Sequence, residues 1–122
     1  MGTDRSQHRY EQLIQEELSK IILRELDVGP GILVTVTKIA ISADFSHARV
    51  YVTVFPDNIT GTVLEKVRKQ RKDYQYFLAD IVRSGRSPQL DFFIDEQAKE
   101  GFKMDEVLDQ ISEELGESNA TE

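Results

Sequence analysis

Residues 32–55 read ILVTVTKIAISADFSHARVYVTVF, and the alternation within this stretch decides the fold. Both halves are rich in Ile, Val and Thr, which is typical of β-strands. One face of the second half carries the apolar residues Ala48, Val50, Val52 and Val54. In the first half the apolar phase changes between Val36 and Ile39, which predicts a β-bulge near Lys38. Residues 43–46 supply a short turn, so the stretch predicts an antiparallel hairpin.

An amphipathic helix is predicted before this hairpin. Apolar residues recur at three- and four-residue steps from Tyr10 to Leu26, and Gly-Pro-Gly at 29–31 ends the pattern. After the hairpin, Thr62 and Glu65 have the spacing of a capping box. This spacing predicts the start of a second helix.

The second helix is expected to break. Its apolar stripe is interrupted after Val67 by the charged run 68–73 and resumes at Tyr74. A continuous helix would place apolar side chains near positions 70 and 71, where Gln and Arg stand. Two helices meeting in a bend at 70–72 explain the pattern better than one straight rod.

The rest of the chain completes the predicted order. Gly85 and Pro88 end the helix pair, and residues 90–94 form a short strand with alternate apolar residues facing inward. The apolar stripe over 104–115 predicts a last helix with an acidic face, and the acidic tail 116–122 is expected to be disordered. The order α-β-β-α-α-β-α predicts a two-layer α+β domain over residues 1–115. Its three-stranded mixed sheet would carry the helices, including the kinked pair, on one face.

The charge is unevenly distributed along the chain. The whole sequence has a net charge of −7, yet residues 61–90 hold seven basic and three acidic residues, whereas residues 91–122 hold two and eleven. The absence of Cys excludes a disulfide framework and thiolate metal sites. The N-terminus lacks the apolar run of a signal peptide, and no segment has about 18 consecutive apolar residues. We therefore expect a cytoplasmic protein whose acidic end conceals a basic centre.

Three local sequences together resemble the ribosome-binding factor A family, which has a KH type II-like fold. One is SADFSHARVYV at 42–52, and a second is PQLDFFID at 88–95, followed by GFKM at 101–104. The third is the leading helix that ends near DVGP at 27–30. The resemblance spans roughly residues 5–111 and therefore the whole predicted domain.

This resemblance implies a non-enzymatic, cytoplasmic ribosome assembly factor. Such a factor would bind the 30S small subunit and its 16S rRNA during late maturation and processing of the pre-16S rRNA, with a link to growth in the cold. We expect a monomer without a cofactor. An alternative from another class is a protein-interaction module whose acidic last helix docks a basic partner without contacting RNA.

The basic centre supplies the candidate RNA contacts. A helix break can spread its cations over one end of the domain, and cations that neutralise phosphates make binding salt-dependent. Tyr76 lies off the apolar stripe and can stack on an unpaired base, whereas Tyr74 fits the core. A charged run on a helix can also be only a solvated face. The candidate RNA-binding residues are Lys66, Arg68, Lys69, Arg71, Lys72, Tyr76, Arg83 and Arg86.

The resemblance also implies an Ala-x-Gly kink where ordinary KH domains have Gly-x-x-Gly. Counting back from Pro88 places this kink on Gln70-Arg71-Lys72, which has neither Ala nor Gly. The two cations Arg71 and Lys72 thus stand where the family has a glycine, whose backbone can adopt more conformations. This departure predicts stronger electrostatic contact with RNA and a less close approach of the helix to the RNA backbone.

Signals for catalysis or metal binding are weak. Asp91 and Asp95 can share one face of a strand, but the sequence places no group to tune them as an acid–base pair. His47 and Asp44 give two ligands in a turn where a metal needs three or four. We predict neither a catalytic residue nor a metal site.

Overall fold

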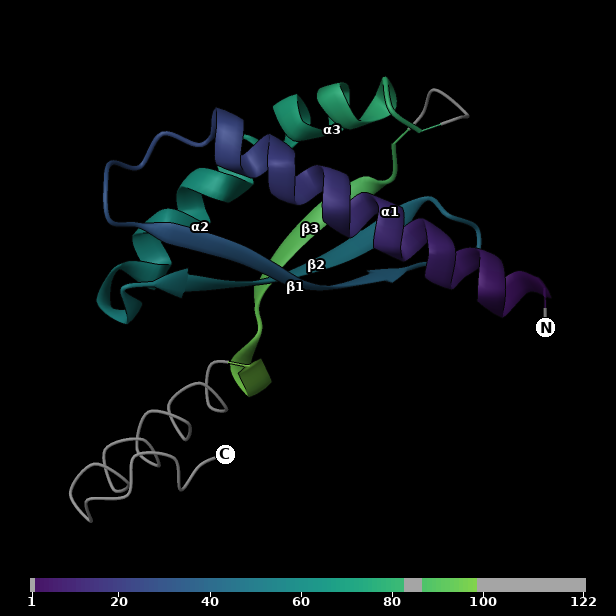
Figure 1. Ribbon diagram of the computed structural model, residues 1–122, viewed down its shortest axis with the longest axis horizontal. Coiled ribbons are helices and arrows are strands. Elements are labelled where there is room, and N and C mark those ends of the chain that lie inside the picture. Colours follow the sequence, from purple (N-terminus) through teal and green to yellow (C-terminus); the bar gives the residue numbers. More distant parts are fainter. Residues whose placement is uncertain (1, 83–86, 99–122) are drawn as a thin grey trace, which may run out of the picture.

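The computed structural model describes residues 2–82 and 87–98 (Figure 1). The elements in chain order are α1 (Gly2–Glu25), β1 (Leu33–Ile41), β2 (His47–Phe55), the 3-10 helix η1 (Asp57–Ile59), α2 (Thr60–Lys69), α3 (Arg71–Ala79) and β3 (Gln89–Ile94). The last helix and the tail that the sequence predicts lie outside the described residues. Within the described ranges, no helix is both long and apolar enough to cross a bilayer.

The three strands form a mixed sheet in the order β1-β2-β3. β1 and β2 are antiparallel, and β3 runs parallel to β2, because the α2–α3 crossover returns the chain to the same end of the sheet. The register shifts between Val36 and Lys38, so Thr37 is the extra residue of a β-bulge. The predicted hairpin and its bulge are both confirmed.

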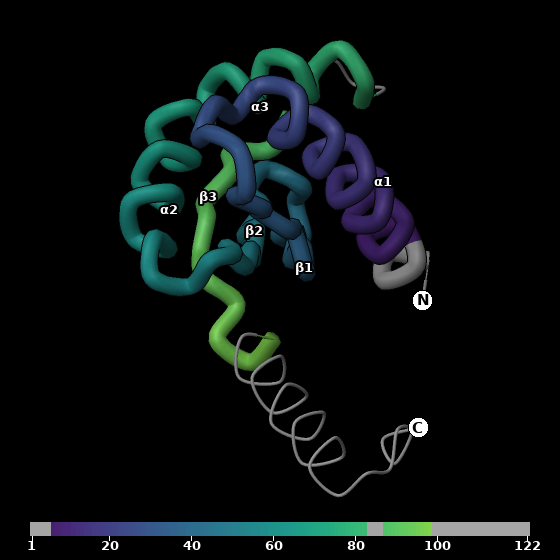
Figure 2. The backbone as a smooth tube through the Cα atoms, turned by 60° about the vertical axis from the view of Figure 1, so that its left-hand side comes forward, coloured from purple at the N-terminus to yellow at the C-terminus, as the bar shows by residue number. Residues whose placement is uncertain are grey.

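α1, α2 and α3 all lie on one face of this sheet, as Figures 1 and 2 show from two directions. The inward side chains of the strands meet the apolar faces of the helices in a single core. At its centre, the ring of Tyr74 lies edge-on to Phe92, with 6.0 Å between the ring centroids. Each large apolar side chain that is fully buried in such a core contributes about 1.5–3 kcal/mol. The two-layer arrangement predicted from the apolar pattern is confirmed.

Side chains of α1 occupy the open edge of β1. Glu11 Oε2 accepts a hydrogen bond from the Ile41 amide at 2.9 Å, and Gln7 Nε2 donates to the Ile41 carbonyl at 3.3 Å. One helical turn further on, Gln15 Nε2 donates to the Val36 carbonyl at 3.0 Å. The spacing of four residues places Gln7, Glu11 and Gln15 in one row along the strand. This row holds α1 along the edge of β1.

Two helix boundaries differ from the sequence prediction. The capping-box interpretation was wrong, because α2 begins at Thr60 and the Thr60 hydroxyl donates to the Asp57 carbonyl of η1 at 2.7 Å. α3 ends at Ala79, earlier than the sequence prediction, which placed the end of the helix pair at Gly85 and Pro88. Val82 still reaches the core from the turn that follows, and Ile81 is exposed.

Candidate nucleic-acid interface

The predicted helix break is present at Gln70. α2 ends at Lys69 and α3 starts at Arg71, with φ −96° and ψ 8° at Gln70 between them. The Gln70 amide donates to the carbonyls of Lys66 and Val67, and its own carbonyl accepts from the Tyr74 amide. The two helices consequently run in different directions (Figures 1 and 2).

The break needs no glycine. Among the described residues, φ is positive only at Phe45, Gly29 and Gly31, so the conformation that favours glycine is not used at residues 69–72. Gln70 instead contributes its side chain, whose Oε1 accepts a hydrogen bond of 2.8 Å from the Tyr74 hydroxyl. This contact explains how a chain without Ala-x-Gly at this place still makes the bend.

Tyr74 belongs to the core, as predicted. Its side chain is fully buried, and this burial raises the pKa of the Tyr74 phenol to about 12, with smaller contributions from the charges of Asp73 and Glu25. The hydroxyl therefore remains a neutral donor to Gln70 at physiological pH. Its ring is not available to bases.

Three of the predicted cations at the break bind their own chain. Lys66 Nζ donates to the Asp27 carbonyl at 2.8 Å, which ties α2 to the loop after α1. The guanidinium of Arg71 forms an ion pair with Asp91, with Nη1 3.8 Å from Oδ1. Arg68 donates from Nε and Nη2 to the carbonyl of Phe92 at 3.1 and 2.7 Å. These three side chains fix the break against the rest of the domain while keeping their charge at its surface.

Arg68 acts together with Gln75, a residue that the sequence did not single out. Gln75 Oε1 accepts a hydrogen bond from the Leu90 amide at 3.0 Å. β3 is an edge strand, and the Leu90 amide and Phe92 carbonyl both point away from β2. Arg68 and Gln75 thus satisfy the open edge of β3. Each contact spans at least 15 residues of chain, so no local pattern signals it.

Lys69 and Lys72 are exposed on either side of the break. Neither has a hydrogen-bond or ion-pair partner among the described residues. Tyr76 follows Lys72 by four residues, which places the two on the same side of α3. The Tyr76 side chain is 70% exposed, and its ring lies edge-on to that of Phe77, with 5.6 Å between the ring centroids. Arg83 and Arg86 lie outside the described residues.

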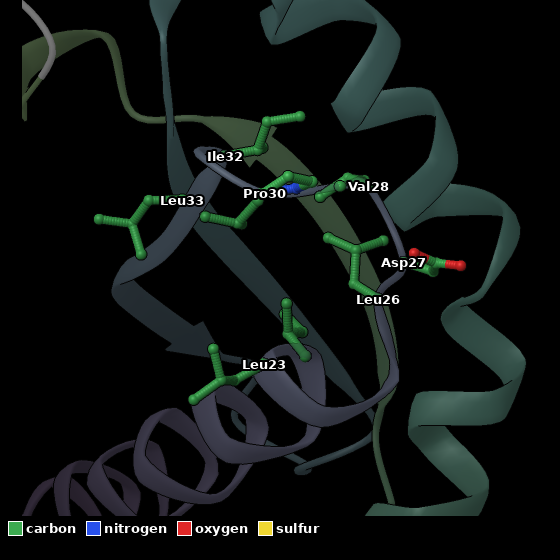
Figure 3. A pocket seen from close by; sticks show the side chains of 10 residues that line it. Leu23, Leu26, Asp27, Val28, Pro30, Ile32 and Leu33 are labelled. Atoms are coloured by element: carbon green, nitrogen blue, oxygen red, sulfur yellow. The ribbon is translucent and has the colours of Figure 1, made fainter.

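Figure 3 shows a separate surface pocket of about 420 Å³ between the end of α1 and the start of β1. Its lining is mostly aliphatic, and it borders Leu23 and Leu33, which are 80% and 55% exposed. Among the described residues that line it, Asp27 alone carries a charge.

The carboxylates considered for chemistry have structural partners. Hydrogen bonds from Thr37 and the Ala98 amide hold the pKa of Asp95 below its usual range, with a further contribution from the charge of Lys38. Hydrogen bonds from Ser46 and Ser42 lower the pKa of Asp44 to about 2 in the hairpin turn. Within the described residues, no three side chains of His, Cys, Asp or Glu are grouped as a metal site would require.

Comparison with known proteins identifies the family. The sequence model of ribosome-binding factor A matches residues 6–108. A ribosome-binding factor A from Syntrophomonas wolfei is 32% identical over 119 residues, covering 94% of this chain and 97% of the relative. Another from Chloroherpeton thalassium is 32% identical over 108 residues, covering 86% of each chain.

Solved structures agree with the sequence comparisons. The crystal structure of ribosome-binding factor A from Thermus thermophilus is 26% identical and covers 72% of this chain and 93% of its own, with a TM-score of 0.62. This match confirms the predicted KH type II-like arrangement of the mixed sheet and its helices. The chain belongs to the ribosome-binding factor A family.

Proposed function

We propose that this protein is a non-enzymatic assembly factor that binds the 30S ribosomal subunit and its 16S rRNA. It would assist late maturation and processing of the pre-16S rRNA in the cytoplasm, as a monomer and without a cofactor, and its role would extend to growth in the cold. Membership of the ribosome-binding factor A family supports a ribosomal partner. The observation that carries the RNA contact is the pair of exposed lysines at the helix break, which have no partner among the described residues.

Lys69 and Lys72 are the proposed direct contacts with phosphate groups. Their ammonium groups are free to exchange counterions for phosphates, because no described residue competes for them. Lys66, Arg68 and Arg71 add positive charge to the same surface while they hold the break in place. Tyr76 is proposed to stack on a neighbouring unpaired base, and Arg83 and Arg86 to extend the charged surface.

Such a surface acts by selective binding. Phosphate contacts carry little sequence information, so the spacing of the cations favours the rRNA conformation that brings phosphates to both lysines. A protein that binds one conformation of a folding RNA more tightly shifts the population toward it. No bond has to be made or broken for this effect.

Co-sedimentation with purified small subunits tests the assignment. We expect Lys69→Glu/Lys72→Glu to weaken binding by about tenfold or more, since each reversal replaces a phosphate contact by repulsion. Arg9→Glu/Lys20→Glu makes the same change in charge at exposed positions of α1 and serves as the matched control. The neutral pair Lys69→Gln/Lys72→Gln should reduce the salt slope of log K by about 1.4–1.8.

Equal loss in the α1 control would mean that net charge alone governs binding and would contradict a local site. Unchanged binding of Lys69→Glu/Lys72→Glu would refute the contact at the break. If binding then disappeared when the acidic residues between 105 and 114 were neutralised, the protein-interaction alternative would be supported instead.

A further inference from the structure

The face of the sheet opposite the helices carries a cross-strand row of a cation and two rings. The register places Lys38 opposite Tyr51 and Tyr51 opposite Phe93. The ring centroids of Tyr51 and Phe93 are 5.8 Å apart with an interplanar angle of 34°, and Lys38 Nζ lies 5.5 Å from the Tyr51 centroid. We call Lys38, Tyr51 and Phe93 the ring row.

The ring row faces away from the helical layer. α1, α2 and α3 all lie on the other side of the sheet in Figures 1 and 2. Phe93 is 40% exposed and Tyr51 is half-buried. Within the described residues, the exposed part of Phe93 is thus the surface of the ring row that a base can contact first.

Charges around the ring row favour an anionic, planar ligand. Arg49 is exposed on the same face, two residues from Tyr51, and Lys38 provides a second cation. Asp91 pairs with Arg71, and Asp95, which stays ionised, lies near Lys38, so the three cations exceed the two carboxylates by one charge. In other folds, exposed sheets bind unpaired nucleotides through aromatic rings that lie beside cations. The base stacks on the ring, and the phosphate contacts the cation.

The ring row also lies close to the helix break. Asp91, which pairs with Arg71, precedes Phe93 by two residues on the same face of β3. Arg68, next to Lys69, binds the carbonyl of Phe92. The break and the ring row thus meet around the edge of β3, where one RNA strand can contact both.

We propose that the ring row is a second RNA-contact surface, which stacks unpaired bases of the RNA whose phosphates the helix break holds. This inference rests on the proposed function for the identity of the partner, but it concerns a different face of the domain. It predicts that the protein prefers RNA segments in which a single-stranded stretch adjoins a structured one.

Binding of the full chain to an unpaired ten-nucleotide RNA, (AC)5, tests the proposal. Tyr51→Leu/Phe93→Leu keeps apolar bulk and removes both rings, and we expect its affinity to fall by about tenfold or more, as loss of base stacking does in other proteins. Phe55→Leu, another exposed aromatic on the same face, is the matched control and should remain within about twofold. Thermal unfolding of each variant establishes that it is folded.

Nuclear magnetic resonance on the intact chain locates the contact. Addition of (AC)5 should shift the ring resonances of Tyr51 and Phe93 and leave those of Tyr74 unchanged. Equal affinity of the double variant and the parent would overturn the proposal. The proposal would also be overturned if these ring resonances did not shift on addition of RNA and showed close contacts to side chains of residues 99–122. The acidic C-terminal segment would then be what binds the ring row.

The two proposals can fail separately. If small subunits require Lys69 and Lys72 but the ring variants bind both subunits and (AC)5 like the parent, only the ring row is refuted. If the ring variants lose (AC)5 while the parent does not bind subunits, the ring row stands as a single-stranded RNA site and the ribosomal function is refuted.

Discussion

Arg68 has a structural role that its sequence context does not indicate. It lies in a run of cations, which predicts contact with phosphate, yet two of its nitrogens donate to the carbonyl of Phe92. A carbonyl at the edge of a sheet accepts such a charged donor well, because the alternative is partial burial without a partner. The neighbouring Lys69 has the same charge and no such contact among the described residues. Of these two adjacent cations, Arg68 thus binds the sheet edge, and Lys69 is left for a partner.

Arg68→Ala should destabilise the domain by about 1–3 kcal/mol, since it leaves the Phe92 carbonyl without its donor. Lys69→Ala, one residue away, should change the free energy of unfolding by less than about 0.5 kcal/mol. Urea unfolding of both variants measures the difference. Similar values for the two would show that Arg68 contributes only charge.

At the scale of elements, the bend between α2 and α3 depends on a pairing across one helical turn. Gln70 has a backbone conformation open to any residue, and its side chain satisfies the hydroxyl of buried Tyr74. The break is thus held by a side chain in place of the backbone freedom of glycine. This chain therefore makes its bend without the Ala-x-Gly that the resemblance implies at this place.

Gln70→Ala should cost about 1–3 kcal/mol in unfolding free energy, because the buried Tyr74 hydroxyl loses its acceptor. Adding Tyr74→Phe removes the unsatisfied hydroxyl, so the double variant should be more stable than Gln70→Ala alone. Chemical denaturation of the two single variants and the double variant completes the cycle. Strict additivity of the two losses would argue against the pairing.

Element types follow well from the sequence of this protein, whereas several boundaries do not. The change of apolar phase predicted a bulge near Lys38, which the structure has at Thr37, and the interrupted stripe predicted a bend at 70–72, which the structure has at Gln70. Both features could be predicted because they alter a short periodic pattern. The capping-box spacing misplaced the start of α2. There, η1 precedes the helix and Thr60 bonds to it, a local arrangement that competes with the box.

The candidate site could be predicted only in part. A charge run identifies cations, but it cannot separate Lys69 and Lys72 from Lys66, whose partner Asp27 is 39 residues away. The ring row was not predicted, since Tyr51 and Phe93 become neighbours only through the parallel pairing of β2 and β3. Outward aromatic residues on two expected strands were the available signal.

At the scale of the whole molecule, the carboxyl groups of Asp44 and Asp95 make the free energy of unfolding depend on pH in the acid range. Hydrogen bonds lower the pKa of Asp44 to about 2 and also lower that of Asp95 in the folded state. A carboxyl group whose pKa is lower in the folded than in the unfolded chain stabilises the fold above its unfolded value. This contribution is lost as the pH falls through the folded pKa.

Asp44→Asn keeps an acceptor in the turn and removes the charge. We expect the parent to be the more stable protein above about pH 4, and its advantage to shrink toward about pH 2 as Asp44 becomes protonated. Thermal midpoints of the two proteins across this range measure the effect. A difference that stayed constant with pH would mean that the ionised form has no special role in the turn.

The side chains that occupy the two sheet edges have a consequence for the order of synthesis. α1 supplies the groups along β1 and is made before it, and α2 and α3 supply those along β3 and are likewise made before it. Unsatisfied strand edges are where nascent or partly folded chains join one another into aggregates. In this protein each outer strand leaves the exit tunnel after the helix that will shield it, so the growing chain need not await a later segment to close its sheet.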